Sequence, residues 1–238
     1  MKIDLHTHSL MSGHAYSTIS EMAQAAALKG LEVLAITDHG PACVGAPSHK
    51  YFRNAQRKPK LINGVRILSG VELNIINGEG GLDLPDEVLE KLDVVIAGLH
   101  SGCGFNDLGI EKNTEAVIKA MQNPYVKILS HPYAKYFELD LEKIVQASIE
   151  NDVMIELNAS YIYTDRSKSE TIYNNMIKTM KLLKAAGRKV VLTSDAHNHE
   201  EVGNFDEALA RLAELGLERE DILNSDVGAV LDFLGVGR

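Results

Sequence analysis

The stretch KIDLHTHSL, residues 2–10, places two histidines one residue apart at the end of what reads as the first strand of the chain. Side chains on a strand alternate between its two faces, so this pattern predicts that His6 and His8 point in one direction. Paired imidazoles are suitable ligands for a transition metal. If they bind a metal, the ends of other strands should supply the remaining ligands.

Short runs rich in β-branched residues recur along the whole chain and are separated by helix-like segments. Seven such runs read as strands, residues 2–5, 32–37, 66–73, 93–99, 126–130, 152–158 and 189–194. One helix is predicted to begin with a capping box of Thr18 and Glu21 and to end at Gly30, and another spans residues 170–187. This alternation predicts right-handed crossovers and a parallel sheet, either closed into a barrel or open with helices on both faces.

Nothing in the sequence marks a domain boundary. No Ser- or Pro-rich linker, low-complexity tract or fixed repeat interrupts the pattern, so residues 1–238 are predicted to form a single domain. Two connections are unusually long, residues 40–65 and the Gly-rich stretch 77–84. Long loops in a compact fold are often functional.

Residues that can bind metals gather at the ends of the predicted strands and in the loop after the first one. Seven of the nine histidines belong to this set, together with two carboxylates. The carboxyl ends of parallel strands lie on one face of an α/β fold, so these residues should converge there. The nine candidate ligands are His6, His8, His14, His39, Glu72, His100, His131, Asp195 and His197.

The number and type of these side chains indicate a catalytic metal centre. Imidazole and carboxylate ligands suit zinc, manganese or iron, whereas calcium and magnesium prefer oxygen ligands. Nine ligands are too many for one tetrahedral ion and suit two or three ions that each keep a position open for water. Ions about 3.5 to 4 Å apart acidify a bridging water and stabilise the attacking and leaving oxygens of a displacement. The pattern is therefore typical of a hydrolase.

The order of the strand-end motifs adds a family resemblance. The motifs are DLHTH at 4–8, TDH at 37–39, GVE ending at Glu72, His100, SHP at 130–132 and SDAH at 194–197. With these motifs the whole chain resembles the PHP (polymerase and histidinol phosphatase) superfamily, and in particular its stand-alone, single-domain phosphatases with a trinuclear metal site. The resemblance implies a distorted, seven-stranded (β/α)7 barrel of the TIM-like type, with the metal site at the C-terminal face of the strands.

The resemblance also implies a role for each of the nine ligands. One metal would be held by His6, His8, Glu72 and Asp195, a second by His100, His131 and a bridging Glu72, and a third by His14, His39 and His197. Glu72, Asp195 and His197 are the expected catalytic residues. Three divalent ions are implied, with zinc expected and manganese and iron as alternatives. Metal-bound hydroxide would then hydrolyse a phosphoric monoester of a small metabolite.

Three basic residues are candidates for binding the phosphorylated substrate, namely Arg53, Arg166 and Lys168. Arg53 belongs to the basic run 50–60, which could guide an anion to the site or form an ordinary solvated loop.

Four further polar residues stand beside the predicted ligands. Asp4 and Asp38 could orient the metal ligands through hydrogen bonds. Asn158 and Ser160 follow the one strand that ends without a ligand and could touch the substrate. For all four, ordinary polarity at a strand end is the alternative.

Composition limits the partners and the compartment. A net charge of −9 argues against nucleic acid and anionic membranes as partners. The two cysteines, Cys43 and Cys103, are too few for a disulfide framework and are expected to be thiols in a reducing compartment. The absence of a signal-peptide pattern and of an apolar run of about 18 residues predicts a cytoplasmic protein. Family resemblance makes a homo-oligomer plausible.

Three alternatives to a phosphomonoesterase remain open. A phosphodiesterase or exonuclease acting on nucleotides is the nearest, although the acidic balance argues against it. An amidohydrolase-type barrel also begins with an HxH strand, but it usually carries a lysine at a strand end, and none of the predicted strands ends in lysine. A non-catalytic metal-binding module is the third, and degenerate domains of this kind lose ligands, whereas this chain has all nine.

Overall fold

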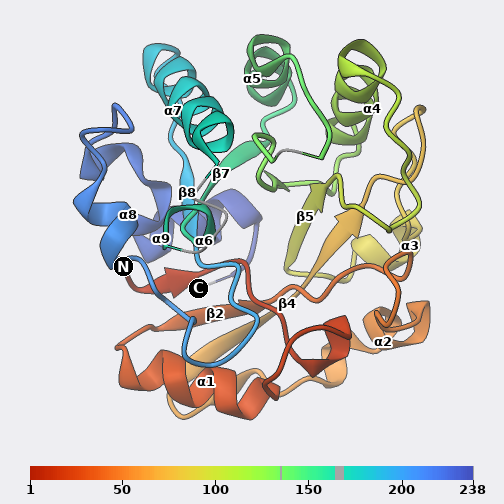
Figure 1. The fold of residues 1–238 in the computed structure, drawn as a ribbon. Helices are drawn as coiled ribbons and strands as arrows, with labels where there is room; N and C mark the ends of the chain where they lie inside the picture. Colours follow the sequence, from red (N-terminus) through yellow and green to blue (C-terminus); the bar gives the residue numbers. More distant parts are fainter. Residues whose placement is uncertain (135, 164–168, 238) are drawn as a thin grey trace.

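Seven parallel strands form the centre of the molecule (Figure 1). The computed structural model describes residues 1–134, 136–163 and 169–237. The strands follow the order β1 (Ile3–Asp4), β2 (Val33–Ile36), β4 (Val65–Asn74), β5 (Val94–Gly98), β6 (Ile128–Leu129), β7 (Met154–Asn158) and β8 (Val191–Thr193). Each lies within one of the seven predicted runs apart from single residues at the ends of β4, so the strand prediction is confirmed.

The sheet curves until its first and last strands meet. The backbone N–H of His8 donates to the carbonyl of Ala196 at 2.8 Å, and that of Asp195 donates to the carbonyl of His6 at 2.9 Å. Thr7 and Ala196 form a parallel bridge beyond β1 and β8. The fold is therefore a nearly closed (β/α)7 barrel, as the resemblance implied, and an open sheet is excluded.

Helices cover the outside of the barrel (Figure 1). The longer ones are α1 (Ile19–Leu28), α4 (Ile110–Met121), α5 (Leu141–Glu150) and α7 (Glu170–Ala185), and α4, α5 and α7 lie next to one another along one side. The shorter ones are α2 (His49–Arg53), α3 (Asp86–Leu89), α6 (Ser160–Tyr163), α8 (Asp206–Ala210) and α9 (Val227–Leu234). Four 3-10 turns are η1 (Leu10–Ser12), η2 (Ala55–Arg57), η4 (Arg219–Asp221) and η5 (Leu223–Ser225). The predicted capping box of Thr18 and Glu21 begins α1, which is confirmed.

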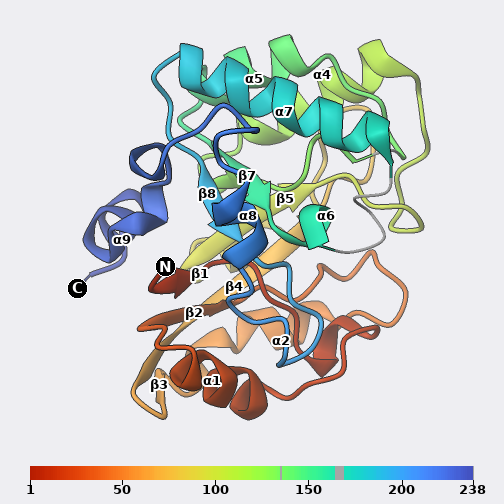
Figure 2. The ribbon, with the colours of Figure 1, turned by 60° about the vertical axis from the view of Figure 1, so that its left-hand side comes forward.

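Apolar side chains on each strand divide between two cores. On β2, Leu34 and Ile36 pack outward in the cluster shared with the helices, whereas Val33 and Ala35 belong to a second cluster inside the barrel. Residues of α9 join this inner cluster, and Figure 2 shows α9 beside the start of β1. The amino-terminal end of the barrel is thus filled by apolar side chains, each stabilised by removal from water.

The inner face becomes polar toward the carboxyl ends of the strands. On β4, Leu68 belongs to the inner cluster and Glu72 follows four residues later on the same face. Ile96 on β5 is followed four residues later by His100, just beyond the strand, and Met154 on β7 is followed two residues later by Glu156. The period of two therefore delivers polar side chains into the barrel just where its apolar filling ends.

The long connection 40–65 is not the single loop that the sequence suggested. It contains α2, η2 and a short strand, β3 (Leu61–Ile62), which pairs antiparallel with β4. Within the basic run, the Lys58 amine is buried and lies 4.4 Å from the centre of the Tyr51 ring. Part of the run therefore packs onto the barrel, whereas the side chains of Lys50, Arg53, Arg57 and Lys60 are exposed, as expected for a solvated loop.

The expectation that both cysteines are thiols is also wrong. Cys43 follows β2 and Cys103 follows β5, and the two form a disulfide across 60 residues of sequence. Both are buried, with 7% and 5% of their surface exposed. β4 alone separates β2 from β5 in the barrel, so the two loops meet although they are distant along the chain. Sequence spacing gave no sign of this contact.

Removing the disulfide should destabilise the protein. Cys103→Ser should lower the free energy of unfolding by about 2 to 4 kcal/mol, because a cross-link over a loop of this length restricts the unfolded chain. Chemical denaturation with and without a dithiol reductant measures the difference, and the variant should not respond to the reductant. Two reactive thiols in the native, untreated protein would contradict the pairing.

Candidate metal centre

Four candidate ligands from the two ends of the chain and from β4 surround one point. The Nε2 atoms of His6 and His8 lie 3.0 Å apart. Asp195 Oδ1 lies 3.2 Å from His8 Nε2 and 3.6 Å from His6 Nε2. Glu72 Oε2 lies 3.2 Å from His6 Nε2 and 3.4 Å from His8 Nε2. This group coincides with the first metal site that the resemblance implied.

The second oxygen of Glu72 faces a different pair of histidines. Oε1 lies 2.9 Å from His100 Nε2 and 3.2 Å from His131 Nε2. The carboxylate is almost fully buried, with 1% of its surface exposed. Its two oxygens are therefore directed to separate groups of ligands, which is the arrangement of a carboxylate that bridges two ions.

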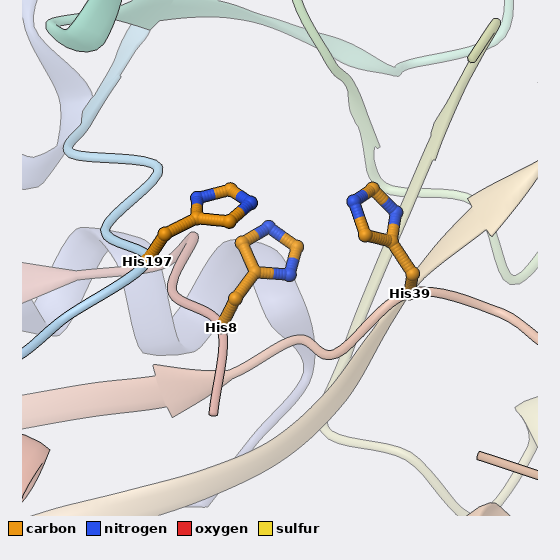
Figure 3. A group of neighbouring side chains, drawn as sticks. All are labelled: His8, His39 and His197. Carbon is orange, nitrogen blue, oxygen red and sulfur yellow. The ribbon is translucent and has the colours of Figure 1, made fainter. Parts of the chain in front are cut away.

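A third group lies nearer the opening of the site. The Nε2 atoms of His14 and His197 are 3.0 Å apart. Figure 3 shows the rings of His8, His39 and His197 converging from three different strand ends, and these three can present donor atoms within 4.8 Å of one another. His39 Nδ1 is also 3.1 Å from Glu72 Oε2, so His39 stands between this group and the bridging carboxylate.

Hydrogen bonds fix the ring orientation of most of the candidate ligands. The Nδ1 atoms contact acceptors as follows: His6 with Glu156 Oε1 at 2.5 Å, His8 with Ser12 Oγ at 3.0 Å, His14 with the Ser12 carbonyl at 3.1 Å, His100 with Asn74 Oδ1 at 2.7 Å and His197 with the Asp195 carbonyl at 2.9 Å. A proton on Nδ1 leaves the Nε2 lone pair free for a metal. The Nε2 atoms of these five rings point into the centre.

Sequence reasoning missed three of these orienting residues, namely Ser12, Glu156 and Asn74. Glu156 is fully buried on β7 and contacts His6, the Thr193 hydroxyl and the backbone N–H of His131. Asn74 ends β4 and contacts His100. Glu156 lies two residues after Met154 of the inner cluster and so faces the interior of the barrel. This alternation along β7 was the one signal that could have identified it.

The polar residues that sequence did single out have structural partners. Asp38 accepts hydrogen bonds from Ser9, Ser12 and Tyr51, and Ser12 in turn contacts His8. Asp38 thereby orients a ligand through Ser12, as expected. Asp4 contacts Ser194 and the Gly203 backbone and fixes the chain after β8.

Asn158 and Ser160 are buried rather than open to a substrate. The Asn158 amide donates to Glu156 Oε2 and to Asp195 Oδ2, both at 3.1 Å. The Ser160 hydroxyl contacts Asn158 Oδ1 at 2.7 Å. These two residues hold the carboxylates beneath the site, and neither lines the cavity described below.

Burial and mutual charge shape the titration of the ligands. Burial raises the pKa of Glu72 and of Asp195, but neighbouring imidazoles outweigh it and hold both pKa values well below their usual range. Burial lowers the pKa of His8 to about 4. For His6 and His131 burial acts downward, yet the surrounding carboxylates raise both pKa values, that of His6 well above 6.5. Without a metal, these two imidazoles supply the positive charge that balances the carboxylates.

Two candidate ligands adopt backbone conformations that are rare for residues with side chains. His131 has φ of 25° and Asp195 has φ of 54°. Leu129 faces the helices, so regular alternation would turn His131 outward as well, and the left-handed backbone brings it into the site. Such strain costs about 1–3 kcal/mol per residue and typically marks functional positions.

An open cavity of about 470 Å³ lies over these ligands. Seven of the nine candidate ligands line it, while His6 and His8 lie beneath. Arg53 is not among the described lining residues, since it extends from α2 into solvent and pairs with Glu87. Arg166 and Lys168 lie outside the described residues.

The donor set fits transition-metal ions. Imidazole nitrogens and carboxylate oxygens surround the centre, and no lysine or arginine among the described residues lines it. The buried Nδ1 of His39 lies 3.1 Å from Glu72 Oε2 but makes no well-oriented hydrogen bond within the described part of the chain. Close pairs of Nε2 lone pairs are unfavourable unless a proton or a metal lies between them. His6, His8, Asp195 and Glu72 could hold one ion, and Glu72 could share a second with His100 and His131.

Comparison with known proteins gives the family. The model of the PHP domain matches residues 4–160. A probable phosphatase of Thermoanaerobacter sp. (strain X514) is 44% identical over 98% of this chain and 94% of its own length. One from Syntrophotalea carbinolica is 41% identical over 99% of this chain and 96% of its own length. The fold is similar to that of histidinol phosphate phosphatase from Lactococcus lactis, which was solved in complex with zinc, L-histidinol and phosphate. The two structures align with a TM-score of 0.61 and 17% sequence identity, over 91% of this chain and 94% of the other.

Loss of the Glu156 carboxylate should weaken metal binding. Glu156→Gln should lower the affinity of the first site by about 10- to 100-fold, because an amide holds the His6 ring in the ligating tautomer less firmly. Competition with a chromophoric chelator measures the affinity, and Glu111→Gln on the exposed start of α4 is the matched control. Equal affinity in both variants would show that Glu156 has no orienting role.

The metal-free protein should lose stability as the pH rises from about 7 to 8, where the opposing contribution of His8, His14 and His39, whose pKa values burial lowers, is nearly complete. Unfolded histidines are mostly neutral there, whereas His6 and His131 keep protons in the folded chain through their raised pKa values. The two protonated imidazoles contribute fully to the free energy of unfolding below the histidine pKa of the unfolded chain. This contribution is lost as the pH rises through their higher pKa values in the folded chain. Above pH 8 the lowered pKa of Lys58, about 8, acts in the opposite direction.

Thermal unfolding of the chelator-treated protein across this range tests the trend. The midpoint should fall with rising pH, and saturating zinc should abolish the fall because the ion replaces both protons. A midpoint that rises with pH in the metal-free protein would contradict the assignment of charge to these histidines.

Proposed function

This chain belongs to the PHP domain family and is a metal-dependent phosphatase, and we propose that it hydrolyses phosphoric monoesters of small metabolites with three divalent ions. The observation that carries the proposal is the bridging geometry of Glu72. Its two oxygens face separate histidine groups, and a third group of imidazoles lies beside them. A shared carboxylate keeps two ions at a fixed separation, which suits an in-line displacement at phosphorus.

The charge of the cavity explains why metal is needed for a phosphate ester to bind. The described lining residues include two carboxylates, Glu72 and Asp195, and no lysine or arginine. A phosphate dianion would be repelled by these groups. Bound divalent ions reverse the local field, so an anion can enter a protein whose net charge is −9.

The three ions would be held by His6, His8, Glu72 and Asp195, by Glu72, His100 and His131, and by His14, His39 and His197. Zinc is the expected ion, with manganese and iron as alternatives. The ions would lower the pKa of bound water and neutralise charge on the transferred phosphoryl group. Asp195 would hold the first ion through Oδ1 while its Oδ2 accepts from Asn158. His197 lies nearer the opening, paired with His14, where it can contact the ester as well as an ion.

The setting of the site supports a preference for monoesters. The cavity lies at loops on the C-terminal face, and the chain as a whole carries a net charge of −9. A long polyanion would meet this surface with little positive charge to replace its counterions. Among the described helices, none combines the length and apolar character needed to cross a bilayer.

Hydrolysis of matched esters tests the proposed function. The protein loaded with zinc or manganese should cleave phenyl phosphate with a kcat/KM at least about 100-fold above that for diphenyl phosphate or a dinucleotide. Inorganic phosphate should bind to the loaded protein and not to the chelator-treated one. Preference for the diester would refute the monoesterase, and turnover that survives complete metal removal would refute the metal dependence.

The third ion should be the easiest to remove. His14 is exposed and His197 is partly exposed, in contrast to the buried ligands of the first site. His14→Ala should lower the metal content by about one ion per chain and reduce kcat while the other ions remain. Metal analysis by mass spectrometry measures this, with His49→Ala at the start of α2 as control. Loss of all metal from the His14 variant would show that the sites are not separable.

A further inference from the structure

One wall of the cavity carries no metal ligand and is largely apolar. It is formed by Leu99, Ala134, Tyr136, Tyr161 and Ile172, with the disulfide of Cys43 and Cys103 beside them. The other described lining residues on this side are Ser101 and Ser169, which are uncharged. A molecule bound over the metal ligands would therefore also meet apolar surface.

This wall adjoins the metal ligands directly. Leu99 immediately precedes His100 in the chain. The Tyr161 ring centre lies 5.6 Å from that of His131 and 5.5 Å from that of Tyr133, perpendicular to the latter. Tyr161 and Ile172 are 7% and 4% exposed, so both are held firmly by packing. A phosphoryl group placed at the ligands would have its ester oxygen within reach of a preformed apolar surface.

Exposed apolar side chains gather around the same end of the barrel. Nine large hydrophobic residues are exposed in the described part of the chain. Seven of them belong to segments that follow the carboxyl ends of strands: Leu10, Met11, Tyr16, Val44, Leu108, Ile110 and Tyr136. Clustered exposed apolar surface typically marks a binding site. Of the seven, Tyr136 lines the cavity itself.

We propose that the substrate of this enzyme is the phosphate monoester of an uncharged, apolar alcohol, whose leaving group rests against Leu99, Tyr161 and Ile172. This inference rests on the proposed phosphatase function and narrows its substrate class. Apolar contact with this wall stabilises such a leaving group. An alcohol bearing a charge would lose hydration against the same wall without gaining an oppositely charged partner from its described side chains.

Binding of non-hydrolysable phosphonates to the metal-loaded protein tests the proposal without turnover. Benzylphosphonate and hexylphosphonate represent aromatic and alkyl alcohols, and 2-hydroxyethylphosphonate represents a polar one. Calorimetric Kd values for the apolar pair should be at least about tenfold lower than for the polar ligand. The ratio of benzyl to hexyl affinity identifies which apolar class the wall prefers. Equal Kd values for all three ligands would overturn the proposal.

Substitutions in the wall locate the preference. Leu99→Asn and Ile172→Asn should each reduce the ratio of benzyl to hydroxyethyl affinity by about threefold or more, with the Kd of inorganic phosphate unchanged. Leu28→Asn is the matched control, because Leu28 is 83% exposed at the end of α1, away from the cavity. If one wall variant fails to fold, the other provides the test. An unchanged ratio in a folded wall variant would refute the assignment.

Ester hydrolysis separates this inference from the function on which it rests. Benzyl phosphate and glycerol phosphate both release alkyl alcohols, so a difference in kcat/KM reports binding of the leaving group. Equal kcat/KM values would refute the apolar preference and leave the phosphatase intact. Selective phosphonate binding without any ester hydrolysis would refute the phosphatase and retain the ligand class.

Discussion

The buried Glu72 carboxylate is the group on which the rest of the metal centre depends. It is surrounded by His6, His39, His100 and His131 at distances of 2.9 to 3.2 Å, inside a barrel that is apolar below it. A buried charge of this kind is costly unless it is paired with opposite charge. The barrel meets this requirement by bringing histidines from the ends of separate strands to one carboxylate. Divalent ions would meet it more completely.

Polar residues that hydrogen-bond to the candidate ligands fix the orientation of the histidine rings. Glu156, Asn74 and Ser12 each fix the ring of one histidine and thereby the nitrogen that it presents. The Oδ1 atom of Asn74 also lies 3.2 Å from the sulfur of the disulfide-bonded Cys43, and the Asn74 amide donates to Asp83 in the Gly-rich connection. The loops that hold the ligands are thus tied to one another beneath the cavity, and a site built in this way keeps its geometry before any metal binds.

The barrel and most of the site follow from local patterns that a sequence displays. Strand periodicity and the capping box at Thr18 depend on neighbouring residues, and the parity of His6 and His8 predicts that they share a direction. Other features depend on packing between distant segments. Three features have no periodic signal in the sequence: the left-handed backbone at His131, the pairing of Cys43 with Cys103 and the secondary structure within residues 40–65. Glu156 lies between apolar residues of β7, and only the completed barrel shows which candidate ligand it orients.

The most direct test of this account is metal stoichiometry and spacing in the wild-type protein and the Glu72→Gln variant. Anomalous diffraction from zinc-loaded crystals gives both. The account predicts two ions on opposite oxygens of Glu72 and a third beside His14 and His197, with the shared pair lost or separated in the variant. An unchanged set of ions in Glu72→Gln, or a single ion in the wild type, would contradict the bridging role.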